Sequence, residues 1–151
     1  MTKNELFDSC LALLQKKIRL QEEQIASLRE SLQQETKSSA GDKHETGRAM
    51  VQLEMERTGE RLRLLEADKQ LLLKIKQQAS SGDADKIGAG SLVHTDRGYY
   101  FLALSLGIID AGEFQVVVVS PGSPLGNAML GRSVGERIMV NGQGLLIKKI
   151  V

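Results

Sequence analysis

Two carboxylates stand three residues apart in a short polar segment of this chain. They are Asp42 and Glu45, in the segment Gly-Asp-Lys-His-Glu at residues 41–45. Carboxylate oxygens suit Mg²⁺, but this ion takes about six oxygen ligands in near-octahedral geometry. Two side chains supply only part of that shell, and the positive charges of Lys43 and Arg48 oppose cation binding by the segment alone. The pair is therefore suited to completing the shell of an ion held elsewhere.

The same spacing also suits the start of a helix. With Asp42 at the N-cap and Glu45 three residues later, each side chain can accept a hydrogen bond from the other residue's backbone N–H, as in a capping box. The two residues therefore have a structural interpretation beside the chemical one. One pair of carboxylates can serve both roles.

Residues 1–79 have the composition and the apolar spacing of two long helices. They contain no Pro and are rich in Glu, Gln, Lys, Arg and Leu, which favour helix. A first run with alternating steps of three and four consists of Phe7, Leu11, Leu14, Ile18, Gln21, Ile25, Leu28 and Leu32. A second run consists of Val51, Met55, Thr58, Leu62, Leu65, Lys69, Leu72, Ile75 and Ala79.

Paired antiparallel, the two runs mirror each other about Lys43. This places Leu14 opposite Leu72 and Ile25 opposite Leu62. The pattern predicts one intramolecular hairpin, an antiparallel coiled-coil finger with its tip at 41–45. Arms of roughly 35 residues would reach about 50 Å.

The second arm leaves two features open. A competing stripe runs through Met50, Leu53, Leu64 and Leu71, so the packing face is a choice between two stripes. Gly59 costs about 1 kcal/mol relative to Ala in a helix interior. Either a bend or a close approach of the two arms would account for this glycine.

Residues 86–151 follow a different pattern, after a linker that we assign to 80–85. Short apolar runs alternate with turn residues, and Asn141-Gly142 is a strong hairpin signal. We expect strands over 91–95, 99–106, 114–119, 137–140 and 145–151.

One short helix is expected among these strands. Ser123 suits its N-cap, Pro124 its first position, and Gly131 its end. We expect Leu125, Met129 and Leu130 to pack it on the sheet. The predicted fold class is α+β, with a helical hairpin followed by a small antiparallel sheet and one short helix.

Composition excludes several classes of function. With 20 basic and 19 acidic residues, the net charge of +1 gives no electrostatic case for a generic nucleic-acid binder. An aromatic content of 3% argues against base-stacking platforms. The single Cys10 suits a reducing compartment, and no apolar stretch approaches the ~18 residues of a membrane span. We expect a soluble, cytoplasmic, monomeric protein without a membrane partner.

Residues 120–131, Ser-Pro-Gly-Ser-Pro-Leu-Gly-Asn-Ala-Met-Leu-Gly, resemble a motif of the Gre transcript-cleavage factors of bacterial RNA polymerase. That motif has Ser, two residues, Ser-Pro, an aliphatic residue, a small residue, any residue, a small residue, two apolar residues and Gly. Every one of these positions is matched here. The Val-Gly-Glu-Arg at 134–137 and the following hairpin turn also resemble the family's ending. The resemblance implies a coiled-coil finger followed by an FKBP-like domain at 86–151.

The resemblance also implies a function. In that family the finger enters the secondary channel of the polymerase, where an Asp and a Glu at the tip help hold the second catalytic Mg²⁺. Asp42 and Glu45 match these two positions. The chain would then be an accessory factor in transcription elongation that promotes cleavage of backtracked RNA, without being an enzyme itself. It would have no cofactor of its own, share Mg²⁺ with the polymerase, and act indirectly on the nascent RNA 3′ end.

The resemblance further implies that the C-terminal domain contacts the rim of the channel through Ser123, Pro124 and Leu125. After Glu45, however, the tip departs from the family. The family continues Asn-Ala-Glu-Tyr where this chain has Thr-Gly-Arg-Ala at 46–49. Two versions therefore remain open, a cleavage factor and a Gre-like regulator that occupies the channel without promoting cleavage.

Two weaker alternatives come from other classes of protein. A peptidyl-prolyl isomerase needs an aromatic-lined pocket, which Tyr99, Tyr100, Phe101 and Phe114 supply poorly. A purely structural coiled-coil protein would leave the carboxylates of the tip without a role.

Overall fold

The computed structural model describes residues 2–37, 42–79 and 82–151. Gly41 at the predicted tip, and Ser80 and Ser81 in the predicted linker, lie outside these residues, as do the side chains at 35–37 and 42–44. Contacts within the chain divide it into two compact units. One is Ala12–Lys69, and the other combines Met1–Leu11 with Gln70–Val151.

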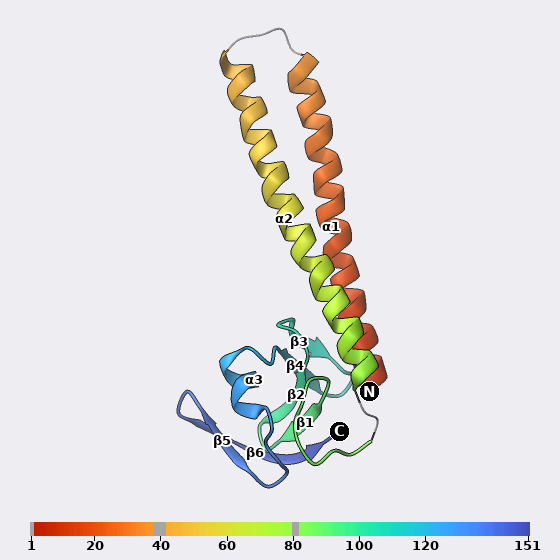
Figure 1. Cartoon of the computed structure of the whole chain (residues 1–151), viewed down its shortest axis with the longest axis vertical. Coiled ribbons are helices and arrows are strands. Elements are labelled where there is room, and N and C mark those ends of the chain that lie inside the picture. Colours follow the sequence, from red (N-terminus) through yellow and green to blue (C-terminus); the bar gives the residue numbers. More distant parts are fainter. Residues whose placement is uncertain (1, 38–41, 80–81) are drawn as a thin grey trace. The chain divides into compact units, whose positions relative to one another are not determined.

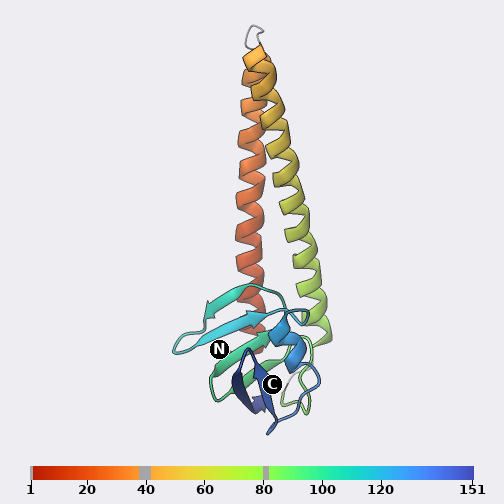
Figure 2. The same ribbon diagram turned by 90° about the vertical axis from the view of Figure 1, so that its left-hand side faces the viewer.

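Two long helices build the first unit. Helix α1 spans Lys3–Lys37 and helix α2 spans Asp42–Gln78. Within 12–69 they run side by side in opposite directions (Figures 1 and 2). The predicted helical hairpin is confirmed. Because α2 begins at Asp42, residues 42–45 of the predicted tip form its first turn.

The face on which this hairpin packs is the predicted one. Within 12–69, every member of the two predicted runs is buried or half-buried, whereas Met50, Leu53 and Leu64 of the competing stripe are exposed. A Cβ added at Gly59 would meet no atom within 4 Å. A close approach of the arms therefore does not explain this glycine.

A six-stranded sheet forms the centre of the second unit, in the order β3-β4-β2-β1-β6-β5. Its strands are β1 (Leu92–Thr95), β2 (Gly98–Leu102), β3 (Gly107–Asp110), β4 (Gln115–Val119), β5 (Arg137–Val140) and β6 (Gln143–Ile150). All neighbours pair antiparallel except β2 and β4, which are parallel. The α+β class is confirmed, and the sheet differs from the expected antiparallel one in this mixed pair.

The region between β2 and β4 differs from the sequence prediction. Strand β2 ends at Leu102, so the strand expected over 99–106 is too long. Ala103 and Leu104 are apolar because they are buried in the following bend, and an apolar run alone does not separate these two cases. Strand β3 was not predicted, because it lies at the sheet edge with Ile108 exposed and lacks the alternation of a half-buried strand.

Both faces of the sheet are covered. Helix α3 (Pro124–Met129) packs on one face through Met129, which is fully buried, and through half-buried Leu125. The buried residues of that face are Ile87, Val93, Leu102, Ile138, Leu145, Ile147 and Ile150. Phe101 on the other face contacts Phe7 of α1. The expected packing of Leu130 is wrong, because this residue is exposed at the C-cap.

None of the helices in the described ranges has the length and apolar composition that a membrane span requires.

Candidate functional site

The two carboxylates of the predicted tip lie on the first turn of α2. Asp42 is the first residue of this helix, and Glu45 is exposed three positions later. Positions three apart on a helix share a face. The partial positive charge of a helix N-terminus also favours carboxylates there. Carboxylates at positions 42 and 45 can supply at most part of the roughly six oxygen ligands that Mg²⁺ takes.

Within the described residues, no group of three or more His, Cys, Asp or Glu side chains is placed to hold a metal ion.

The serines of the 120–131 motif build the start of α3. Ser123 is the N-cap, and its Oγ accepts a hydrogen bond from the Gly126 backbone N–H at 3.0 Å. The same hydroxyl donates to the Ser120 carbonyl at 2.7 Å, and the Ser120 hydroxyl in turn accepts from the Gly122 N–H at 3.1 Å. These bonds satisfy backbone groups that a helix start leaves unpaired.

Gly126 is required by the close approach of two backbone segments. A Cβ at this position would lie 1.9 Å from the Ser120 carbonyl oxygen. At the other end of α3, Gly131 has φ +75° and its N–H donates to the Ile87 carbonyl at 2.8 Å. Much of the motif is therefore explained by the local structure it builds.

Pro124 and Leu125, the two residues that follow the N-cap, are both accessible to a partner. Pro124 is exposed, and Leu125 is half-buried at the edge of a pocket of about 330 Å³. The other lining residues are Tyr100, Val140, Asn141, Gln143 and Leu145. Tyr100 is the one aromatic residue among these lining residues, so the pocket lacks the aromatic lining that a prolyl isomerase needs.

The sequence did not indicate this pocket, because its walls come from α3, β2 and the β5–β6 hairpin. Asn141 and Gly142 form the two-residue turn of that hairpin, with φ of +51° and +78°. Both positive values are typical of a type I′ turn, as the Asn-Gly pair predicts. The turn chemistry was predictable, but the approach of the turn to α3 was not.

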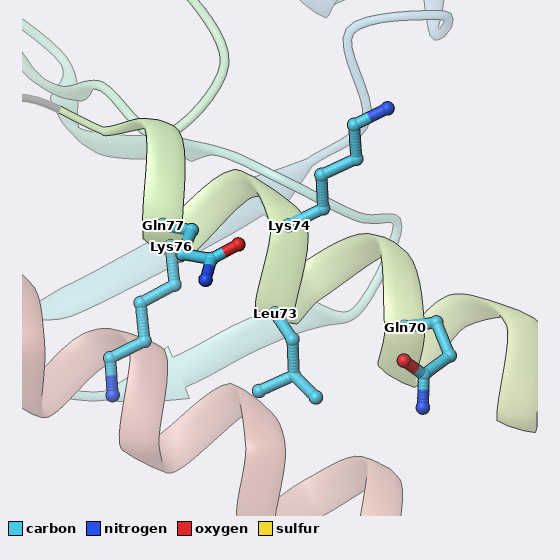
Figure 3. Close-up of a pocket in the computed structure, with 5 residues that line it drawn as sticks. All are labelled: Gln70, Leu73, Lys74, Lys76 and Gln77. Carbon is cyan, nitrogen blue, oxygen red and sulfur yellow. The ribbon is translucent and has the colours of Figure 1, made fainter.

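A larger hollow of about 620 Å³ lies along the last turns of α2, lined by Gln70, Leu73, Lys74, Lys76 and Gln77. Figure 3 shows Lys74 extending away from the side on which Leu73 lies. The Lys76 Nζ is 3.1 Å from the Asp8 Oδ1 in an exposed ion pair. Because its polar groups do not converge on one point, we assign no ligand to this hollow.

The surroundings of His94 and Cys10 indicate that both residues have a structural role. The His94 ring stacks flat on Tyr99, with centroids 4.5 Å apart, and Tyr99 contacts Phe114 at 4.3 Å. Cys10 is buried, and burial raises the pKa of its thiol to about 11. The thiol is therefore protonated near neutral pH and is a poor nucleophile.

Comparison with solved structures finds similar chains at low sequence identity. Solved structures similar to this chain include two of a GreA homologue. One is GreA factor homolog 1 (Gfh1) of Thermus thermophilus, at 17% identity over 93% of this chain and 94% of that chain, with a TM-score of 0.36. The other is the transcription factor Gfh1, at 19% identity over 93% and 92%, with a TM-score of 0.35.

No protein-family model matches the chain, and a search of curated proteins gave no match.

Proposed function

We propose that this chain is a Gre-like elongation factor that binds bacterial RNA polymerase and promotes cleavage of backtracked RNA. The observation that carries the proposal is the position of Asp42 and Glu45 beside the reversal of a long helical hairpin. The portion of α1 within 12–37 alone is about 40 Å long. Such a finger is suited to carrying two carboxylates into a narrow channel.

The part of this chain in the reaction is to position two carboxylates. Helix α2 fixes Asp42 and Glu45 one turn apart, so both are brought to the polymerase active site together. A Mg²⁺ ion shared with the polymerase would supply charge stabilisation of the attacking and leaving oxygens. The chain needs no metal of its own, because its pair fills only part of the shell.

The second unit is the proposed docking domain on the rim of the channel. Ser123 holds the N-terminus of α3 and thereby presents Pro124 and Leu125 beside the pocket formed with Tyr100. This arrangement supports a positioning role for Ser123, with Pro124 and Leu125 as the contact residues. A protein with this role would work in the cytoplasm, where the polymerase is.

The decisive experiment measures RNA cleavage in backtracked elongation complexes. We expect wild type to stimulate cleavage, and Asp42→Asn and Glu45→Gln to abolish stimulation while binding is retained. Each substitution keeps the shape of the side chain but removes the charge that a hard cation requires. Glu22→Gln, which changes an exposed carboxylate of α1, is the matched control and should stay active.

A Gre-like regulator is the second candidate, and exposed Arg48 supports it. This residue places a positive charge three positions after Glu45 on the same helix. If wild type gives no stimulation at any Mg²⁺ concentration yet competes with an active cleavage factor, the regulator is correct. Neither cleavage nor competition would refute the polymerase proposal.

A further inference from the structure

Helix α2 carries a second stripe on the outside of the hairpin, which is apolar at both ends and charged at its centre. It has the alternating steps of three and four that mark a coiled-coil seam. We define the outer stripe as Met50, Leu53, Arg57, Glu60, Leu64 and Ala67. All six residues are exposed, with Met50 at 68%, Leu53 at 47% and Leu64 at 56% of full accessibility.

The outer stripe is charge-complementary to itself when two copies of α2 are placed antiparallel. If Arg57 is set opposite Glu60 of a second copy, Glu60 comes to lie opposite the second copy's Arg57. In the same register Leu53 meets Leu64, and Met50 meets Ala67. These pairs follow from the spacing of the stripe alone. In an antiparallel contact, moving toward the C-terminus of one helix means moving by the same step toward the N-terminus of the other.

The residues flanking the stripe agree with this register. Glu54 comes beside Arg61 of the second copy on one side of the stripe, and Glu56 comes beside Arg63 on the other, so each flanking pair joins opposite charges. The parallel, in-register arrangement instead sets Arg57 against Arg57 and Glu60 against Glu60, and like charges at such positions are unfavourable. Of these two orientations, only the antiparallel one has complementary charges.

We propose that two copies of this chain associate through the outer stripe of α2, in an antiparallel contact whose register is set by Arg57 and Glu60. The occupant of this exposed face is thus a second copy of the same chain. The sequence alone led us to expect a monomer, and the exposure of the stripe is the observation that changes this expectation. The inference does not depend on the proposed function.

The central charges determine the register of the contact more than its affinity. Glu60 already accepts two hydrogen bonds from Arg63, at 3.1 Å and 2.5 Å, and Glu54 lies 3.5 Å from Arg61. Exchanging exposed pairs within the helix for pairs between helices changes the free energy little. The affinity must come from a few apolar side chains, so the dimer is weak and dependent on protein concentration.

Sedimentation equilibrium of the full chain, from roughly 10 µM to about 1 mM, tests this proposal, because a weak contact is populated only at such concentrations. We expect the average mass of wild type to rise toward twice the monomer mass. Arg57→Glu and Glu60→Arg should each stay monomeric, because each sets like charges at the centre. The double exchange, Arg57→Glu with Glu60→Arg, should associate like wild type.

Mixing the two single variants should also restore association, because their charges are complementary to each other. Glu30→Arg, which reverses an exposed carboxylate of α1, is the matched control and should behave as wild type. Circular dichroism checks that each variant keeps its helices, since Arg and Glu have similar helix propensity.

The proposal is overturned if wild type remains monomeric over the whole concentration range. It is also overturned if a single reversal associates as strongly as wild type, or if neither the double exchange nor the mixture restores association. In each of these cases the stripe does not pair with a second copy, whatever other partner covers it.

Discussion

The rings of Phe7 and Phe101 meet edge to face, with centroids 4.9 Å apart and planes at 82°. Phe7 belongs to the first turns of α1, and Phe101 lies in β2, so this contact joins the N-terminus of the chain to the sheet within one compact unit. Both rings are buried. One face of the sheet in the C-terminal half is therefore covered in part by a residue from the opposite end of the sequence.

Phe7→Ala should destabilise this unit by about 3 kcal/mol, because it removes a buried ring and leaves a cavity against Phe101. Denaturant unfolding measures the change. Asn4→Ala, at an exposed position of the same helix, serves as the control and should change stability by less than about 0.5 kcal/mol. A similar small effect of Phe7→Ala would show that the unit is stable without this contact.

Thr58→Val should stabilise the finger by about 1 kcal/mol. Thr58 is fully buried in α2, and its hydroxyl has no hydrogen-bond partner. An unsatisfied buried hydroxyl is unfavourable, whereas Val has the same shape and a similar helix propensity. The measurement is the thermal unfolding of the helical signal, with Thr58→Ser as the opposite control, which should lower stability. A lower melting temperature for Thr58→Val would contradict this account.

Gly126→Ala should destabilise the second unit by about 2 kcal/mol, because the new methyl group would overlap the Ser120 carbonyl oxygen and force the backbone to move. Gly122→Ala is the matched control in the same motif. A Cβ there would meet only the Ser120 hydroxyl oxygen, at an ordinary 3.7 Å. Equal effects of the two substitutions in chemical denaturation would refute the steric explanation.

Asp96 should contribute to the pH dependence of stability at the acid end. The Leu146 N–H donates to the Asp96 Oδ1 at 2.9 Å, and this bond, with Arg137 and Arg97 nearby, lowers the carboxyl pKa below its ordinary 3.8. Because the folded pKa is lowered, the stabilisation is present above the unfolded pKa and is lost as the pH falls through the folded one.

An NMR titration of the Asp96 carboxyl should therefore give a midpoint below 3.8. Asp96→Asn retains an acceptor for Leu146 but should remove this part of the acid dependence. A midpoint at or above the ordinary value would show that the hydrogen bond does not stabilise the charged form.

Arg48→Glu with Ala49→Tyr should raise stimulated RNA cleavage if the chain is a weak cleavage factor. The first change replaces a positive charge near Glu45 with a negative one, which favours cation recruitment. Initial cleavage rates in backtracked complexes measure the effect. Arg29→Glu, at an exposed position on α1, controls for net charge. Unchanged activity in the double variant would show that Arg48 does not limit metal recruitment.

The helical hairpin was predictable because the apolar spacing that specifies it is a local pattern repeated along both helices. The runs that include Leu14, Ile25 and Leu62 set the face that is buried, whereas residues 42–45 of the predicted tip form the first turn of α2. The cap of α3 at Ser123 and the turn at Asn141 were equally readable, since each depends on the conformational preferences of a few adjacent residues. The choice between the two stripes of α2 stayed open in the sequence, because both have steps of three and four, and burial in the folded hairpin decided it.

Only the tertiary structure decided those features that depend on contacts between residues far apart in the sequence. The bend after Leu102 and the parallel pairing of β2 with β4 were not visible, because a buried apolar run has the same composition in a strand and in a bend. The contact of Phe7 with Phe101 and the pocket beside Leu125 bring together residues far apart in sequence. Local propensity sets which elements form, but burial in a shared core sets which of them meet, and that is a property of the whole chain.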